Sequence, residues 1–99
     1  MADELPPGDT PWAVPLAQDL VRIGRHAEND VRLNDKTVHR YHALVQRSSD
    51  GEFLIRDLSG AAGNGVYVNG SRIELAPLHS GDLVELGAVR LRFQQARPS

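Results

Sequence analysis

The chain has 99 residues, a formal net charge of -2 at pH 7, no cysteine and 40% hydrophobic residues. This composition suits one globular domain with a modest core, and it excludes disulfides and thiolate metal ligands. The negative net charge argues against a protein built mainly to hold nucleic acid. No apolar run approaches the roughly 20 residues that span a bilayer, and no secretory leader is evident. We therefore expect a cytoplasmic domain without membrane insertion.

The first part of the chain divides by composition. Residues 1–11 are proline-rich and polar without periodicity, which predicts a flexible arm. We expect the folded domain to cover residues 12–95 and a disordered tail to follow at 96–99. Within the domain, Trp12 to Leu16 and Leu20 to Ile23 predict two strands.

Short apolar runs separated by turn residues continue along the rest of the chain. Asn69-Gly70 can supply the positive φ angles of a tight hairpin. No long window carries a helical apolar stripe, so the spacing predicts an all-β chain folded as a two-sheet β-sandwich. The further expected strands are a short one around Val31 and Leu33, then His42 to Gln46, Phe53 to Asp57, Val66 to Val68, Arg72 to Ile73, Leu83 to Leu86 and Val89 to Phe93.

Positive charge is concentrated in one segment of an otherwise near-neutral chain. Five of the eleven basic residues lie between residues 22 and 40, while the acidic residues are scattered. A local cluster of this kind favours a site for an anion over a nucleic-acid surface. The five residues are Arg22, Arg25, Arg32, Lys36 and Arg40.

Three motifs follow one another at fixed distances. Gly24-Arg25 ends a strand, the polar turn Thr37 to His42 follows, and Asn64-Gly65 comes after two further expected strands. This order resembles the forkhead-associated (FHA) domain, a family that reads phosphothreonine in partner proteins. The resemblance runs from Val21 to Phe93 and implies a β-sandwich with its recognition loops at one end, in agreement with the strand pattern.

The resemblance also implies roles for individual residues. Arg25 matches the family's phosphate-binding arginine, whose planar fork suits phosphate geometry. Gly24 lets the backbone turn so that Arg25 projects from the strand end. His42 matches a buried histidine that braces the loops. Asn64 matches an asparagine that bonds the backbone of the bound peptide, and Gly65 supports that turn.

Two positions depart from the family pattern. His39 stands where the family usually has a serine that donates to phosphate. An imidazole N–H could replace that donor, or the change could mark a site that no longer binds phosphate. Gly63 replaces a threonine that helps select the methyl group of phosphothreonine. A phosphoserine ligand is therefore also an alternative. The family further implies that Arg40 contacts the peptide and that Thr37 helps to set specificity.

Other kinds of site are weaker hypotheses. His39 and His42, with His26 nearby, have no carboxylate or cysteine at a recognised spacing, so we expect no metal site. No nucleophile elbow or phosphate-cradling loop occurs, so we expect neither an enzyme nor a cofactor.

The favoured function is a phosphorylation-dependent interaction module for a Ser/Thr-phosphorylated partner, without a nucleic-acid ligand. The alternative is a phosphate-independent assembly domain that uses the same sandwich. We expect the isolated domain to be monomeric.

Overall fold

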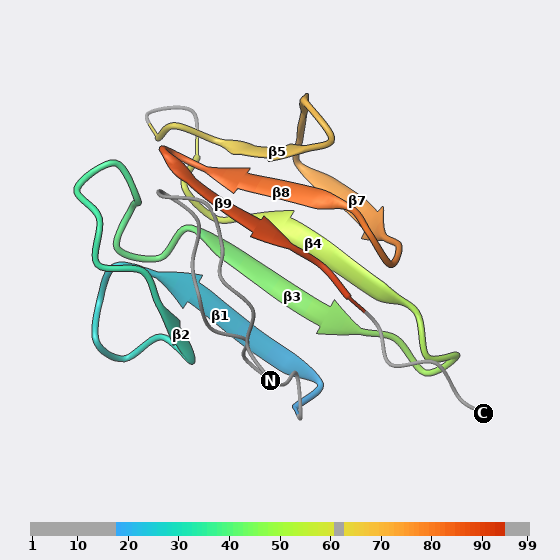
Figure 1. Ribbon diagram of the computed structural model, residues 1–99. Coiled ribbons are helices and arrows are strands. Elements are labelled where there is room, and N and C mark those ends of the chain that lie inside the picture. Colours follow the sequence, from blue (N-terminus) through green and yellow to red (C-terminus); the bar gives the residue numbers. More distant parts are fainter. Residues whose placement is uncertain (1–17, 61–62, 95–99) are drawn as a thin grey trace, which may run out of the picture.

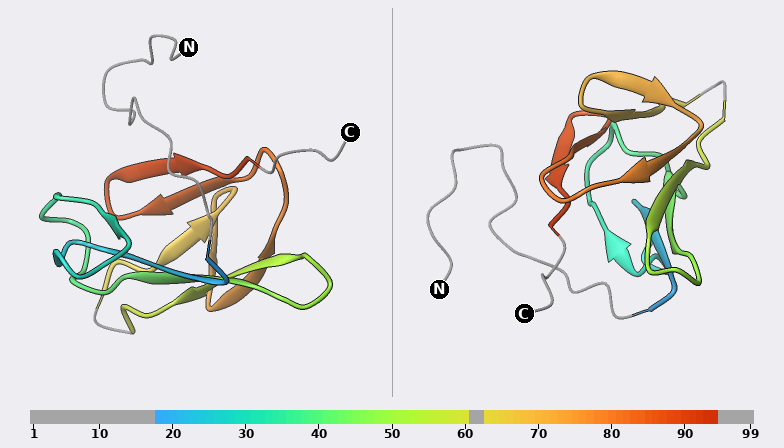
Figure 2. Two further views of the ribbon diagram at one scale, coloured as in Figure 1. Left: turned by 90° about the horizontal axis from the view of Figure 1, so that it is seen from below. Right: turned by 90° about the vertical axis from the view of Figure 1, so that its right-hand side faces the viewer.

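The computed structural model describes residues 18–60 and 63–94. Their strands form two sheets that pack face to face (Figures 1 and 2), so the predicted all-β, two-sheet architecture is confirmed. No helix occurs within these residues, and hence none that is long and apolar enough to cross a membrane. The strands are β1 Leu20–Gly24, β2 Val31–Arg32, β3 Ala43–Arg47, β4 Phe53–Asp57, β5 Val66–Val68, β6 Ser71–Ile73, β7 Leu75–Leu78, β8 Leu83–Leu86 and β9 Val89–Arg92.

The first sheet has the strand order β2-β1-β3-β4-β7. Its central strands are antiparallel, whereas the short β2 pairs in parallel with the end of β1. Alternate residues face the core, as the two-residue period of a half-buried strand requires. In β1, for example, Val21 and Ile23 are buried, while Leu20 and Arg22 are exposed.

The second sheet has the order β6-β5-β8-β9. The β5–β6 hairpin turns at Asn69 and Gly70, with φ angles of 52° and 88°. These positive values confirm the expected Asn-Gly turn, which suits the right-handed twist of the strands. The β8–β9 hairpin turns at Gly87, where φ is 62°.

One apolar core fills the space between the sheets. Phe53 from the first sheet and Phe93, which follows β9, meet edge to face with ring centroids 5.3 Å apart. Burial of this aliphatic and aromatic surface supplies the main driving force for folding. The buried hydrophobic residues are Val21, Ile23, Val31, Leu33, Val38, Ala43, Val45, Phe53, Ile55, Val66, Leu78, Val84, Leu86 and Phe93.

Strand β7 is missing from the sequence-based prediction. Pro77 lies within it and argues against a strand, because proline cannot donate to a β-ladder. Here β7 is the edge strand of the first sheet, and Pro77 pairs opposite Leu54. An edge strand has a neighbour on one side only, so the missing N–H of proline does not interrupt a ladder between two central strands. The expected arm at residues 1–11, the strand Trp12 to Leu16 and the tail at 96–99 lie outside the described residues.

Candidate functional site

Three connections meet at one end of the sandwich, on the left of Figure 1. We call them the first loop (residues 25–30, between β1 and β2), the second loop (33–42, between β2 and β3) and the third loop (the described residues 58–60 and 63–65, between β4 and β5). The β8–β9 turn reaches the same end. The three sequence motifs therefore come together in space.

Arg25 is held at the strand end by the second loop. Its backbone N–H donates to the His39 carbonyl at 3.0 Å, and its side-chain Nε donates to the Val38 carbonyl, also at 3.0 Å. The side chain is exposed. Within the described part of the chain, the two terminal guanidinium nitrogens have no protein partner. Arg25 is thus fixed in direction by two bonds to the second loop.

The first and second loops are joined next to Arg25 by a close backbone approach and by the side chain of Asn29. A β-carbon on Gly24 would lie 2.2 Å from the Arg40 carbonyl oxygen, so the close approach requires glycine. The side chain of Asn29 is 7% exposed, and its Nδ2 donates to the carbonyls of Arg40 at 2.7 Å and His26 at 2.8 Å. Asn29 therefore links the backbone of the first loop to that of the second loop.

His42 joins the second loop to the third. Its side chain is fully buried, Nδ1 accepts the His39 N–H at 2.9 Å, and Nε2 lies 2.7 Å from the Gly65 carbonyl. Because Nδ1 is an acceptor, Nε2 must carry the proton and donate it to that carbonyl. One ring thus holds the backbone of His39 and the turn that presents Asn64.

Thr37 takes part in a second connection between loops. Its carbonyl accepts from Asn64 Nδ2 at 2.6 Å, while its hydroxyl donates to Asp35 at 2.5 Å and accepts the Ala88 N–H at 2.7 Å. The Thr37 hydroxyl is therefore occupied within the protein. A β-carbon on Gly87 would lie 2.3 Å from the Thr37 carbonyl oxygen, so the β8–β9 turn packs directly under the second loop.

Hydrogen bonds to the Asp35 carboxylate lower its pKa. The Thr37 hydroxyl has the largest effect, followed by the Thr37 backbone N–H. Both stabilise the ionised form and keep a negative charge at the base of the second loop.

Gly63 lies where a side chain would not fit. A β-carbon there would come within 2.4 Å of Ser59 Cβ, and Ser59 is buried with its hydroxyl bonded to Asp57 at 2.6 Å. The threonine usual in the family therefore requires a different loop path.

An aromatic contact covers the outer side of the first two loops. The rings of His26 and Tyr41 stack with centroids 5.4 Å apart, and the Tyr41 hydroxyl donates to Glu28 at 3.2 Å. Desolvation, followed by the negative charge of Glu28, raises the pKa of Tyr41. The stack ties the residue after Arg25 to the residue after Arg40.

The predicted site residues are thus brought to one surface. The side chains of Arg25, His39 and Arg40 are exposed beside one another in the first two loops, and that of Asn64 is exposed in the third. Thr37 and Gly63 instead belong to the framework of the loops. In the described residues, no three histidine, cysteine or acidic side chains form a group that could hold a metal.

Sequence reasoning overlooked several residues that shape the site: Asn29, Asp35, Asp57, Ser59 and Gly87. A repeated pattern could have found three of these five residues, Asp35, Asp57 and Ser59. In both Asp35-x-Thr37 and Asp57-x-Ser59, the carboxylate accepts the backbone N–H and the hydroxyl two residues later. This side-chain turn is a local preference of aspartate.

The comparisons with known proteins agree with this geometry. The family model for the FHA domain matches residues 21–87. The glycogen accumulation regulator GarA of Mycolicibacterium smegmatis is 41% identical over 78 residues, which are 79% of this chain and 48% of GarA. The chain thus spans about half the length of this curated relative.

Solved structures give the same result. Mycobacterium tuberculosis EmbR in complex with a low-affinity phosphopeptide superposes with a TM-score of 0.75 and 31% identity, covering 86% of this chain and 22% of that one. A structure from work on phosphothreonine-dependent FHA domain interactions has a TM-score of 0.76 and 26% identity, covering 84% and 83%. GarA is named as a regulator rather than an enzyme, and the region that matches here is the FHA domain. The chain belongs to the FHA domain family.

Proposed function

We propose that this domain binds a phosphothreonine-containing segment of a partner protein through the first, second and third loops. It would bind this segment without catalysing a reaction. The observation that carries the proposal is Arg25, which is fixed through Nε while its terminal nitrogens remain available. A phosphate dianion needs such a fixed cation and converging donors. Arg40 and His39 flank Arg25 and can supply them.

The peptide backbone would be held by Asn64. Its Nδ2 donates to the Thr37 carbonyl, so its Oδ1 is oriented away from that bond and can accept a backbone N–H. Because Gly63 offers no side chain to contact a methyl group, we propose that phosphoserine is discriminated against only weakly. We also propose the cytoplasm as the compartment, since the cysteine-free chain suits a reducing environment.

Calorimetry with matched phosphorylated and unphosphorylated peptides tests the proposal. A phosphothreonine peptide should bind, and its unphosphorylated form should not. Arg25→Ala should weaken phosphopeptide binding by about 2–4 kcal/mol, the scale for truncating one partner of a charged pair. Its unfolding midpoint should stay close to that of the wild type, because the side chain is exposed. Unchanged affinity in a folded Arg25→Ala variant would contradict the proposal.

One observation favours the alternative of a phosphate-independent assembly domain. His39 occupies the position of the family's hydroxyl donor, and its exposed side chain makes no hydrogen bond among the described residues. Absence of phosphopeptide binding in the wild type, with binding gained by His39→Ser, would identify His39 as the residue that disabled the site.

A further inference from the structure

Arg72 lies against the third loop, next to the residue proposed to hold the peptide backbone. It belongs to the edge strand β6 and pairs opposite Tyr67 of β5. A β-carbon on Gly65 would lie 2.6 Å from Arg72 Nε and 2.9 Å from Cζ. The guanidinium therefore covers the backbone immediately after Asn64.

Gly65 is contacted on two sides, by His42 and by Arg72. The His42 ring bonds the Gly65 carbonyl from the interior, while the Arg72 guanidinium packs on its outer surface. With φ at 83°, Gly65 also has a conformation that L side chains rarely adopt. Without a β-carbon at this position, Arg72 can approach the loop that carries Asn64.

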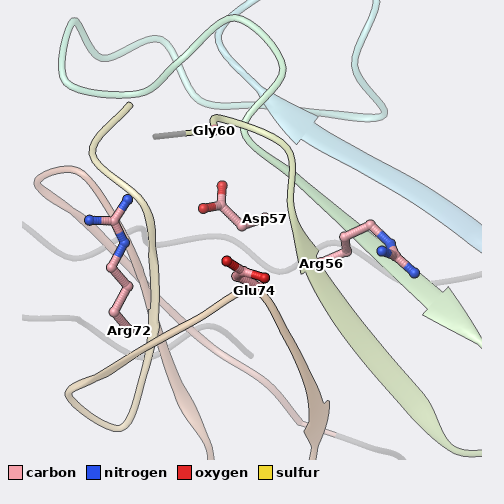
Figure 3. Close-up of a pocket in the computed structure, with 5 residues that line it drawn as sticks. All are labelled: Arg56, Asp57, Gly60, Arg72 and Glu74. Atoms are coloured by element: carbon pink, nitrogen blue, oxygen red, sulfur yellow. The ribbon is translucent and has the colours of Figure 1, made fainter. Parts of the chain in front are cut away.

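The positive charge of Arg72 is not paired with a negative charge within the described residues. In residues 18–60 and 63–94, no carboxylate lies within ion-pair distance of its guanidinium. Arg72 lines a surface recess of about 440 Å³ together with Arg56, Asp57, Gly60 and Glu74. Figure 3 shows the guanidinium of Arg72 alongside the third loop, the two carboxylates near the middle, and Arg56 directed to the opposite side.

We propose that Arg72 reads an anionic side chain, an acidic or second phosphorylated residue, that flanks the phosphothreonine of the bound segment. The proposal rests on the function proposed above, because the segment must first be held by Arg25 and Asn64. A chain that reaches Asn64 passes next to the guanidinium, which offers a planar fork to a carboxylate or phosphate. Glu74 and Asp57 disfavour a ligand that enters deeper into the recess with its own negative charge.

Phosphothreonine peptides with a single scanned substitution test this assignment. Each flanking position carries aspartate, phosphoserine or asparagine in turn, and affinity is measured by fluorescence polarisation. One position should prefer the anionic residue to asparagine in the wild type. Arg72→Ala should abolish that preference, a loss of roughly 2- to 5-fold for an exposed pair, and should leave the asparagine peptide unaffected.

Two variants of the same recess serve as controls. Arg56→Ala should retain the preference, because Arg56 points away from the loop. Glu74→Gln should increase it, because a repelling charge is removed. A preference for aspartate or phosphoserine that persists in Arg72→Ala would overturn the assignment, and so would equal weakening of all peptides.

The two proposals fail in different ways. If phosphothreonine peptides bind and depend on Arg25 but Arg72→Ala has no selective effect, only the role of Arg72 is refuted. If no peptide binds better than its unphosphorylated form, the proposed function is refuted and the role of Arg72 with it.

Discussion

At the scale of single residues, Arg25 has a divided role. One guanidinium nitrogen bonds the Val38 carbonyl, and the other two have no partner within the described residues. A lysine at this position could not bond the carbonyl and a ligand in the same fixed geometry, because its ammonium is a single point charge on a flexible stem. The anchoring bond and the proposed phosphate contact therefore both depend on a planar fork.

This division predicts the effect of Arg25→Lys. The variant keeps the charge but should lose most of the affinity that Arg25→Ala loses, since the ammonium is no longer held in direction. Calorimetry with the same phosphopeptide measures the difference, and thermal melting checks that the fold persists. Affinity within twofold of the wild type would show that charge alone is sufficient.

His42 is expected to matter for stability through its two bonds. In His42→Ala, the His39 N–H and the Gly65 carbonyl lose their partner in a buried position, which should cost about 1–3 kcal/mol of unfolding free energy. Asn64→Ala breaks one exposed bond and should cost about 1 kcal/mol or less, while it weakens peptide binding. Urea unfolding of both variants provides the measurement, and a larger loss for Asn64→Ala would mean that these roles are reversed.

At the scale of elements, the β8–β9 turn supports the recognition loops although it carries no motif of its own. Gly87 combines a positive φ with contact to the Thr37 carbonyl, and Ala88 donates to the Thr37 hydroxyl. Movement of this hairpin must therefore displace the second loop. Sequence comparison of motifs alone would assign the turn no part in binding.

Substitution of Gly87 tests this support. Gly87→Ala should destabilise the protein by about 1–3 kcal/mol and weaken phosphopeptide binding, because the backbone strain is combined with a steric clash. Gly51→Ala is the matched control. Gly51 has a φ of 87° but no atom near its missing β-carbon, so its variant suffers backbone strain alone. Equal losses in both variants would show that the contact with Thr37 contributes nothing.

The expected strands were mostly correct because alternation and turn residues are local properties of the chain. Strand β7 was missed because its place at a sheet edge, which accommodates Pro77, depends on the whole topology. The same distinction applies to the site. Arg25 and Asn64 could be identified from motif spacing, whereas the contact of Gly87 with Thr37 joins segments that are far apart in the sequence.

At the scale of the whole molecule, acid should unfold the domain by protonating hydrogen-bonded carboxylates. The pKa values of Asp30, Asp35, Asp50 and Asp82 are lowered, in each case chiefly by a hydrogen bond to the ionised carboxylate. Groups with lowered folded-state pKa values stabilise the fold above their unfolded value of about 3.9. That contribution is lost as the pH falls through the folded-state values.

The melting temperature should therefore change little from neutral pH down to about pH 5 and fall steeply below about pH 4. Asp35→Asn keeps an oxygen that can accept from Thr37 but cannot titrate, so its acid slope should be shallower. Thermal melts monitored by circular dichroism across this range measure both effects. A slope in Asp35→Asn identical to that of the wild type would exclude Asp35 from the acid transition.

The bonds that His42, Asn29 and Asn64 make between loops also have a kinetic consequence. Because these bonds already hold the three loops together, a ligand that binds there need not wait for the loops to rearrange. The observed association rate should rise linearly with peptide concentration, without a plateau, in stopped-flow measurements. Differences in affinity between ligands should then appear as differences in residence time.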